Sequence, residues 1–388
     1  MKGELNNMRL YKMEFYRLCC KKIFIIGVAC VIGIVLFAFC LKVKGEETTI
    51  DGITYKGYRA VQMDREITEE FKGVLTDEKA EKIIEKYGFP SEVEVYYDYY
   101  RDANYLNGWI ERMLSDGNYF DWDNYKISTV IYPIKDTELE KARALTGTEL
   151  VLDYSNGWVT FLDVMEMGLI LGSILILYGT STVFAGERQS NTLQLLFTTK
   201  EGRSGDIYAK MAAAFTVGFS VWFGVIIIDL ALCGMVYGFG GLRCLVGTTS
   251  IAYYHVITYL PYTMWTMGTM IVTVLLRSLL GVFLLCSMTI CISAYLKSTF
   301  NAVILAAIVW VLPLLLWILL REMGLYSVFY TISYIIKYFI FASPIYSVMY
   351  EAVSESCRVL IILSVMAAAG LVLCSASAYR KYKGQQVV

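Results

Sequence analysis

The chain has 388 residues, of which 57% are hydrophobic and 18% charged, and its mean hydropathy is +0.53. A water-soluble domain of this size could hardly present such a composition at its surface, so soluble classes are excluded and an integral membrane protein is predicted. The formal net charge of -1 averages over strongly segregated segments and says little about partners. We expect no nucleic-acid partner.

The N-terminal segment is basic, and the stretch from Arg9 to Lys22 places bulky apolar side chains among its charges. An apolar run follows over 23–41, long enough to cross a hydrocarbon core of about 30 Å as a helix. A secretory signal peptide would end in small residues at a cleavage site, whereas bulky side chains fill the end of this run. We therefore predict a cytoplasmic amphipathic entry helix over 1–22 and a retained first span over 23–41.

Residues 42–163 differ in character from the rest of the chain, with 24 Asp and Glu against 15 Lys and Arg between positions 42 and 162. We predict a folded, acidic, water-facing domain of mixed α+β structure. Its first part alternates apolar and polar residues, which predicts a strand or hairpin around Asp51-Gly52. Thr76 is a residue type favoured at helix N-caps, so a helix is predicted from Asp77 to Tyr87, ending at Gly88.

Aromatic residues are dense between positions 93 and 122 and allow two interpretations. They could form a platform for a sugar or peptide. Because each aromatic side chain buries a large area, we favour the interpretation in which they build the core of a small domain. Asp121, Asp123 and Asn124 resemble part of a calcium loop, but the remaining ligand pattern does not follow, so no metal site is predicted.

Five further spans are predicted within 164–388. They cover 164–184, 211–236, 279–296, 300–320 and 359–378. Arg277 interrupts the apolar run that leads into the fourth span, and a charge at the bilayer centre is costly, so we place the segment before Arg277 in a helix at the membrane interface. Asp229, inside the third span, has two interpretations: a structural or packing role, or a role in a gate or substrate path.

The distribution of basic residues predicts the orientation of these spans. With the N-terminus inside, the cytoplasmic segments hold fourteen Lys and Arg and the short outer loops hold five. Cytoplasmic loops carry the excess of such residues, so both termini are predicted to be cytoplasmic. We predict an α-helical polytopic protein of the bacterial plasma membrane, with six transmembrane helices and a large mixed α+β extracytoplasmic domain between the first and second spans.

The cytoplasmic loop over 185–210 is the most informative stretch of the chain. Leu193, Leu196 and Phe197 lie on one side of a predicted helix, and polar residues lie on the other. Such an amphipathic helix is suited to lying on lipid or to docking in a groove of a partner.

In this loop the sequence resembles the permeases of ATP-binding cassette (ABC) exporters of the second type. Their equivalent loop reads roughly F-x-x-E-x-x-x-G-T-L, followed by two leucines, a short polar stretch, an Arg and a Lys. The matching residues are Glu187, Thr192, Leu193, Leu195, Leu196, Arg203 and Lys210. Asn191 replaces the family's Gly, and 199–203 replaces its commoner Pro-containing turn. The resemblance extends to the six spans, the entry helix and a tight turn at 293–299, and so covers nearly the whole chain.

In such exporters the loop helix is a coupling helix that contacts a separate ATP-binding subunit. The resemblance implies that Glu187 and Arg203 fix the loop and its ATPase contact, with the entry helix on the same cytoplasmic surface. The candidate coupling residues are Glu187, Arg188, Asn191, Thr192, Leu193, Leu196 and Arg203 in the loop, and Arg9, Glu14 and Arg17 in the entry helix.

The resemblance also implies the partners. The sequence has no G-x-x-x-x-G-K-[ST] motif, so we expect a chain that is not an enzyme and binds no cofactor, with ATP and Mg on the partner ATPase. A second permease copy or a paralogue would form a dimer with this chain, in contact with membrane lipid.

Two other classes of function stay open. One is a membrane-anchored receptor or sensor whose outer domain binds a ligand. The other is an enzyme that acts on a lipid-linked substrate through Asp229 or the outer carboxylates. The loop over 185–210 separates these classes from a permease, because neither needs an amphipathic docking helix at that place.

Overall fold

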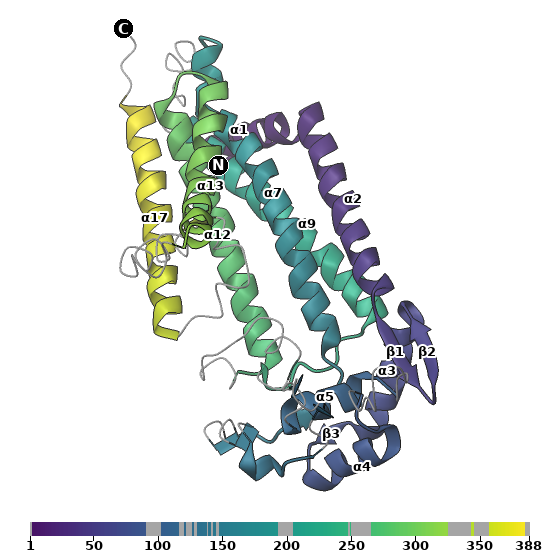
Figure 1. Cartoon of the computed structure of the whole chain (residues 1–388). Helices are drawn as coiled ribbons and strands as arrows, with labels where there is room; N and C mark the ends of the chain where they lie inside the picture. The colour runs from purple at the N-terminus through teal and green to yellow at the C-terminus, as the bar shows by residue number, and fades with distance from the viewer. Residues whose placement is uncertain are drawn as a thin grey trace.

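A computed structural model of the chain shows a bundle of long helices with a smaller α/β unit at one end (Figure 1). It describes residues 2–90, 102–115, 120–121, 126–127, 130–137, 139–140, 143–144, 147–192, 205–246, 249, 265–324, 343–344 and 357–384. Within these residues, six helices are long and apolar enough to cross a membrane. They are α2 (Lys22–Lys44), α7 (Asn156–Gln189), α9 (Gly205–Val236), α12 (Met267–Tyr295), α13 (Thr299–Glu322) and α17 (Cys357–Lys383). The predicted number and order of spans are confirmed.

Helix α7 lies at the centre of the bundle and packs against α2, α9, α12 and α13. Small residues permit this close packing. A Cβ atom added at Gly168 would lie 2.6 Å from a methyl group of Val225 on α9, and one added at Gly218 would lie 2.4 Å from Cys286 Sγ on α12. Without a hydrophobic driving force between helices in lipid, such close backbone approach is a main source of packing energy.

The entry helix α1 (Lys2–Cys19) crosses the end of the bundle that holds both termini and leads into α2 (Figure 1). It packs mainly against α9. Leu18, at its last turn, is buried in an apolar cluster with Phe184 of α7, Ile207 of α9 and Tyr382 of α17. One face of a short basic helix is thereby fixed to three of the long helices.

The structure corrects the prediction for the fourth span. Helix α12 is continuous from Met267, so Arg277 lies inside the helix and not in an interfacial segment before a span over 279–296. The side chain of Arg277 is 6% exposed, and its Nη1 donates hydrogen bonds to Ser364 Oγ at 3.0 Å and the Leu360 carbonyl at 3.5 Å on α17. A charged group at membrane depth is tolerated where it faces the bundle and finds polar partners.

The α/β unit occupies the end of the bundle opposite the termini (Figure 1). Its elements are β1 (Glu47–Ile50), β2 (Ile53–Lys56), α3 (Tyr58–Phe71), β3 (Gly73–Val74), α4 (Asp77–Tyr87), α5 (Tyr105–Leu114), β4 (Phe120–Asp121), β5 (Lys126–Ile127), the 3-10 turn η1 (Ile134–Asp136) and β6 (Val151–Leu152). The strands form three antiparallel pairs, β1-β2, β3-β6 and β4-β5. The side of the membrane on which this unit lies stays a prediction from the charge distribution.

Two local predictions for this unit are confirmed. The hairpin turns at Asp51 and Gly52, which have φ of 52° and 73°, the pair of left-handed residues that a tight type I′ turn requires. Helix α4 runs from Asp77 to Tyr87, and the Thr76 hydroxyl accepts a hydrogen bond from the Lys79 amide at 3.2 Å. Helix α7 begins at Asn156, so the last eight residues assigned to the domain are already helical and continuous with the second span.

The core of the α/β unit is apolar and partly aromatic. It contains Ile83, Trp109, Ile110 and Leu152, and Leu245 enters it from the connection between α9 and α12. Trp109 is 2% exposed, in agreement with the interpretation of the aromatic run as core. The other aromatic residues at 96–100, and the calcium-like residues at 123–124, lie outside the described residues.

Candidate functional site

The end of α7 is shaped by a left-handed residue, Asn191, which leads toward α9. Asn191 has φ of 55°, and the Thr192 amide donates to the Glu187 carbonyl at 3.1 Å. Glycine is the usual residue in this conformation at a helix C-terminus, and Asn is the commonest alternative. Asn191, which stands where the resemblance would place a Gly, therefore suits this backbone turn.

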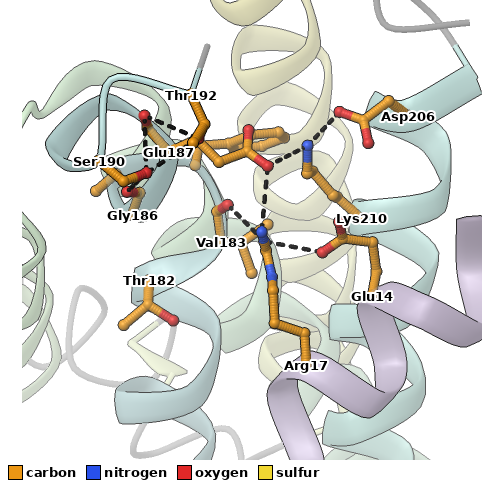
Figure 2. A network of polar contacts seen from close by, with 12 residues as sticks. Glu14, Arg17, Thr182, Val183, Gly186, Glu187, Ser190, Thr192, Asp206 and Lys210 are labelled. Carbon is orange, nitrogen blue, oxygen red and sulfur yellow. Dashed lines mark hydrogen bonds and ion pairs between the residues drawn. The ribbon is translucent and has the colours of Figure 1, made fainter. Parts of the chain in front are cut away.

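Glu187, in the last turn of α7, is the hub of a buried ion-pair cluster (Figure 2). Its carboxylate lies 3.2 Å from Arg17 Nη1 of α1 and 2.5 Å from Lys210 Nζ of α9, and it accepts a hydrogen bond from the Tyr382 hydroxyl of α17. Glu187 is 3% exposed. One side chain of α7 thus contacts α1, α9 and α17.

Both cations of the cluster have a second carboxylate partner. Arg17 lies 2.8 Å from Glu14 on its own helix, and Lys210, whose side chain is fully buried, also contacts Asp206 one turn earlier on α9. Burial raises the pKa of Glu14 against the opposing effect of Arg17. Buried charges are tolerated only when they are paired and hydrogen-bonded, and the shared carboxylate of Glu187 supplies both conditions.

The next two residues of α7 hold the turn between α12 and α13. Arg188 donates to the carbonyl groups of Ala294 and Leu296, the latter at 2.9 Å. The Gln189 side-chain oxygen accepts hydrogen bonds from the Thr299 amide at 3.0 Å and hydroxyl at 2.5 Å. The carbonyl groups at the end of α12 and the first amide of α13 are thereby satisfied by α7.

The family of the chain follows from the sequence as a whole. The model of a family described as "ABC-2 family transporter protein" matches residues 8–381. The chain belongs to the ABC-2 transporter family. The resemblance seen in the loop is therefore confirmed, and the chain is a membrane permease component of an ABC transporter. Comparison with the curated proteins and with the solved structures gives no match.

In this ABC-2 family permease, the structure brings several of the predicted coupling residues together. Glu14, Arg17 and Glu187 share the buried cluster, and Arg188, Asn191 and Thr192 follow directly. Arg9 is exposed on α1 outside the cluster. Leu193, Leu196 and Arg203 lie outside the described residues.

Sequence reasoning missed the roles of three residues in the permease cluster. Asp206 and Lys210 are four positions apart at the start of an apolar run, a spacing that places both on one helix face and could have signalled an ion pair. Tyr382 is 195 positions from Glu187, and no local pattern connects the two.

Asp229 of the permease lies far from this cluster. It is fully buried on α9, 19 residues or about 28 Å along the helix from Lys210. Its Oδ1 accepts a weak hydrogen bond from Cys233 Sγ at 3.6 Å, one turn further along the helix. The structure does not connect Asp229 with the coupling residues, and a gate or substrate-path role for it stays a prediction.

Proposed function

We propose that this chain is the permease subunit of an ABC exporter, which moves a substrate out of the cytoplasm with energy from ATP hydrolysed by a separate subunit. Membership of the ABC-2 family supports this proposal, because permeases of the family generally work with an ATP-binding subunit. ATP and Mg would bind that partner. In this proposal the end of the bundle with both termini faces the cytoplasm, as the excess of basic residues at that end favours.

The buried cluster around Glu187 is the single observation that carries the proposed coupling. The loop over 193–204 is 12 residues long, and its two flanks are tied together, because Glu187 before it contacts Lys210 after it. A partner that pushes on this loop would therefore displace the ends of α7 and α9 as one body. Through Arg17 and Tyr382 the same push would reach α1 and α17.

The hydrogen bonds that join α7 to the α12–α13 turn extend the proposed coupling to two further helices. Arg188 and Gln189 hold this turn to the end of α7, next to Glu187. Inside the bundle, Ser293 Oγ accepts hydrogen bonds from the Phe184 and Ala185 amides at 3.0 and 2.9 Å. Movement of one helix end is thus passed to the remaining spans through hydrogen bonds of fixed geometry.

A second permease copy or a paralogue would complete the transport path, with lipid around both. Large apolar side chains on α13 are exposed in the single chain, among them Phe300, Ile308, Leu315 and Leu319. Exposed apolar helix faces in a membrane protein contact lipid or another subunit.

The proposal is tested by expressing the chain with the ATP-binding subunit encoded beside it. We expect the two to purify together and the permease to stimulate ATP hydrolysis. Glu187→Ala and Arg203→Ala should abolish the stimulation, while Glu78→Ala, on the exposed face of α4 at the other end of the molecule, should leave it unchanged.

Thermal unfolding of each purified variant separates lost coupling from lost folding. A Glu187→Ala variant that is folded and still retains the ATP-binding subunit, but no longer stimulates hydrolysis, would support the proposed role. If no ATP-binding subunit associates and hydrolysis never depends on this chain, the exporter proposal is wrong.

A further inference from the structure

A cavity of about 700 Å³ lies between the end of α2 and the start of α7, on the side of the bundle next to the α/β unit. Its position is at the opposite end of these helices from the Glu187 cluster. The walls are formed by Ala38, Leu41, Lys42, Gly45, Glu46, Asn156, Val159, Thr160, Asp163, Val164 and Met167. Neither the coupling cluster nor Asp229 takes part in it.

The lining comes from one face of each helix. The α7 residues recur at intervals of three and four from Asn156 to Met167, which places them on a single helix face. Met167 lies about 16 Å deeper along the axis than Asn156. The polar side chains lie toward the α/β unit, and Met167, Val164 and Ala38 form the floor toward the centre of the bundle. The cavity therefore has one polar and one apolar end.

Glu46 provides an unbalanced negative charge at the polar end. Its carboxylate accepts hydrogen bonds from the Tyr237 hydroxyl at 2.9 Å and from Asn156 Nδ2 at 3.2 Å, both neutral donors. Within the part of the chain that the structure describes, Lys42 is the one cationic residue of the cavity lining, and its Nζ lies 2.6 Å from Asp163. Two carboxylates thus face one ammonium group.

Burial makes the charged form of Glu46 depend on its surroundings. Removal from water raises the pKa of Glu46, while the hydrogen bond from Tyr237 and the charge of Lys42 lower it, so an ammonium group in the cavity would stabilise the carboxylate. The hydrogen bonds from Tyr237 and Asn156 hold the carboxylate in place, so a cation that enters finds an acceptor that needs no rearrangement. A charge-assisted hydrogen bond to a positioned carboxylate is about twice as strong as a neutral one.

We propose that this cavity binds the ammonium group of an amphiphile, with Glu46 as its acceptor and the apolar tail against Val164, Met167 and Ala38. Met167 is 45% exposed, so the apolar end opens toward the surroundings of the bundle and a tail can leave the cavity sideways. The ammonium group can belong to a membrane lipid or to a soluble cationic amphiphile. The site goes beyond the proposed transport function and does not depend on an ATP-binding subunit.

Binding is measured on the full chain, without an ATP-binding subunit, in neutral dodecyl maltoside micelles. The probe is a fluorescent dodecylammonium, compared with the same molecule carrying a hydroxyl in place of the ammonium. Glu46→Gln keeps the acceptor for Tyr237 and Asn156 but removes the charge, and should weaken ammonium binding about tenfold or more. Glu47→Gln is the matched control, because the neighbouring Glu47 is exposed and pairs with Lys56 at 2.6 Å; it should bind as the wild type.

Two further experiments test the apolar end of the cavity and the source of the ligand. Ala38→Phe fills the apolar end and should weaken the dodecyl probe more than a butylammonium probe. Phosphatidylethanolamine added to the micelles should displace the probe if a lipid is the natural ligand, while phosphatidylglycerol, which has no ammonium group, should not. Failure of both lipids to displace a Glu46-dependent probe assigns the site to a soluble amphiphile.

Displacement by lipid and the absence of displacement are both consistent with an ammonium site. The proposal is overturned if the hydroxyl probe binds the wild type as tightly as the ammonium probe, a comparison that needs no variant to fold. Equal ammonium binding by the wild type and a folded Glu46→Gln variant overturns it as well. Neither outcome affects the proposed ATP-driven export, which is tested by stimulation of hydrolysis.

Discussion

Removal of single charges from the buried cluster should destabilise the protein by unequal amounts. Glu187→Gln leaves each cation with one carboxylate, since Arg17 keeps Glu14 at 2.8 Å and Lys210 keeps Asp206. Lys210→Met is more severe, because Asp206, which is 2% exposed, loses the ammonium group that it contacts directly. Breaking a buried pair so that a charge is left uncompensated costs about 3–5 kcal/mol, and we expect that range for Lys210→Met.

For Glu187→Gln we expect about 2–3 kcal/mol, nearer the value of a lost charge-assisted hydrogen bond. The double variant should cost less than the sum of the two single variants, because the two residues contact each other at 2.5 Å. The assay is unfolding of the purified chain in mixed micelles with increasing SDS, followed by tryptophan fluorescence.

The exposed pair between Glu70 and Lys86 serves as the control. The two side chains are 54% and 46% exposed and lie 2.6 Å apart, so Glu70→Gln and Lys86→Met should each cost at most about 1 kcal/mol. The reasoning is refuted if the buried variants fall in the range of the exposed ones. It is also refuted if Glu187→Gln is more destabilising than Lys210→Met.

Three further predictions concern other parts of the molecule. Burial raises the pKa of Asp64 to about 7, so the folded state holds this proton to higher pH than the unfolded chain, and stability should fall as the pH rises from about 4 to 7 and then level off. Asp64→Asn should flatten that part of a plot of melting temperature against pH, and an unchanged slope would contradict the assignment. Gly218→Ala should cost about 1–3 kcal/mol by overpacking against Cys286, whereas Gly33→Ala, with open space around it, should be neutral or stabilising in the same unfolding assay. Alkaline phosphatase fused after position 148 should be active and a green fluorescent protein at the C-terminus should fluoresce; the reverse pattern would invert the predicted orientation.

The elements that could be predicted from sequence are those set by local chemistry. The hairpin at Asp51-Gly52 and the helix capped by Thr76 depend on residues that are neighbours in the chain. The six apolar runs likewise carry their own signal, since each one satisfies its backbone hydrogen bonds internally when it forms a helix.

The predictions failed where contacts between residues far apart in the sequence determine the structure. In the sequence Arg277 interrupts an apolar run, and its hydrogen bonds to Ser364 and the Leu360 carbonyl of α17 help to explain why α12 continues through it. The candidate site was found in part, through Glu187 and Arg17, because the loop resembles that of a family. Tyr382 could not be found in this way, since it lies 195 positions from Glu187 and no local pattern connects the two.

The Glu187 cluster can form only late in the biosynthesis of the protein, because its members lie far apart in the sequence. Arg17 and Tyr382 are 365 positions apart, and at about 5–20 residues per second their synthesis is separated by about 20 to 70 s. Glu187 precedes Tyr382 by 195 positions, so its carboxylate lacks the hydroxyl of the last helix for about 10 to 40 s of that interval. The cluster is complete only when α17 has been inserted, so a chain truncated before that helix leaves the carboxylate of Glu187 without the Tyr382 hydroxyl.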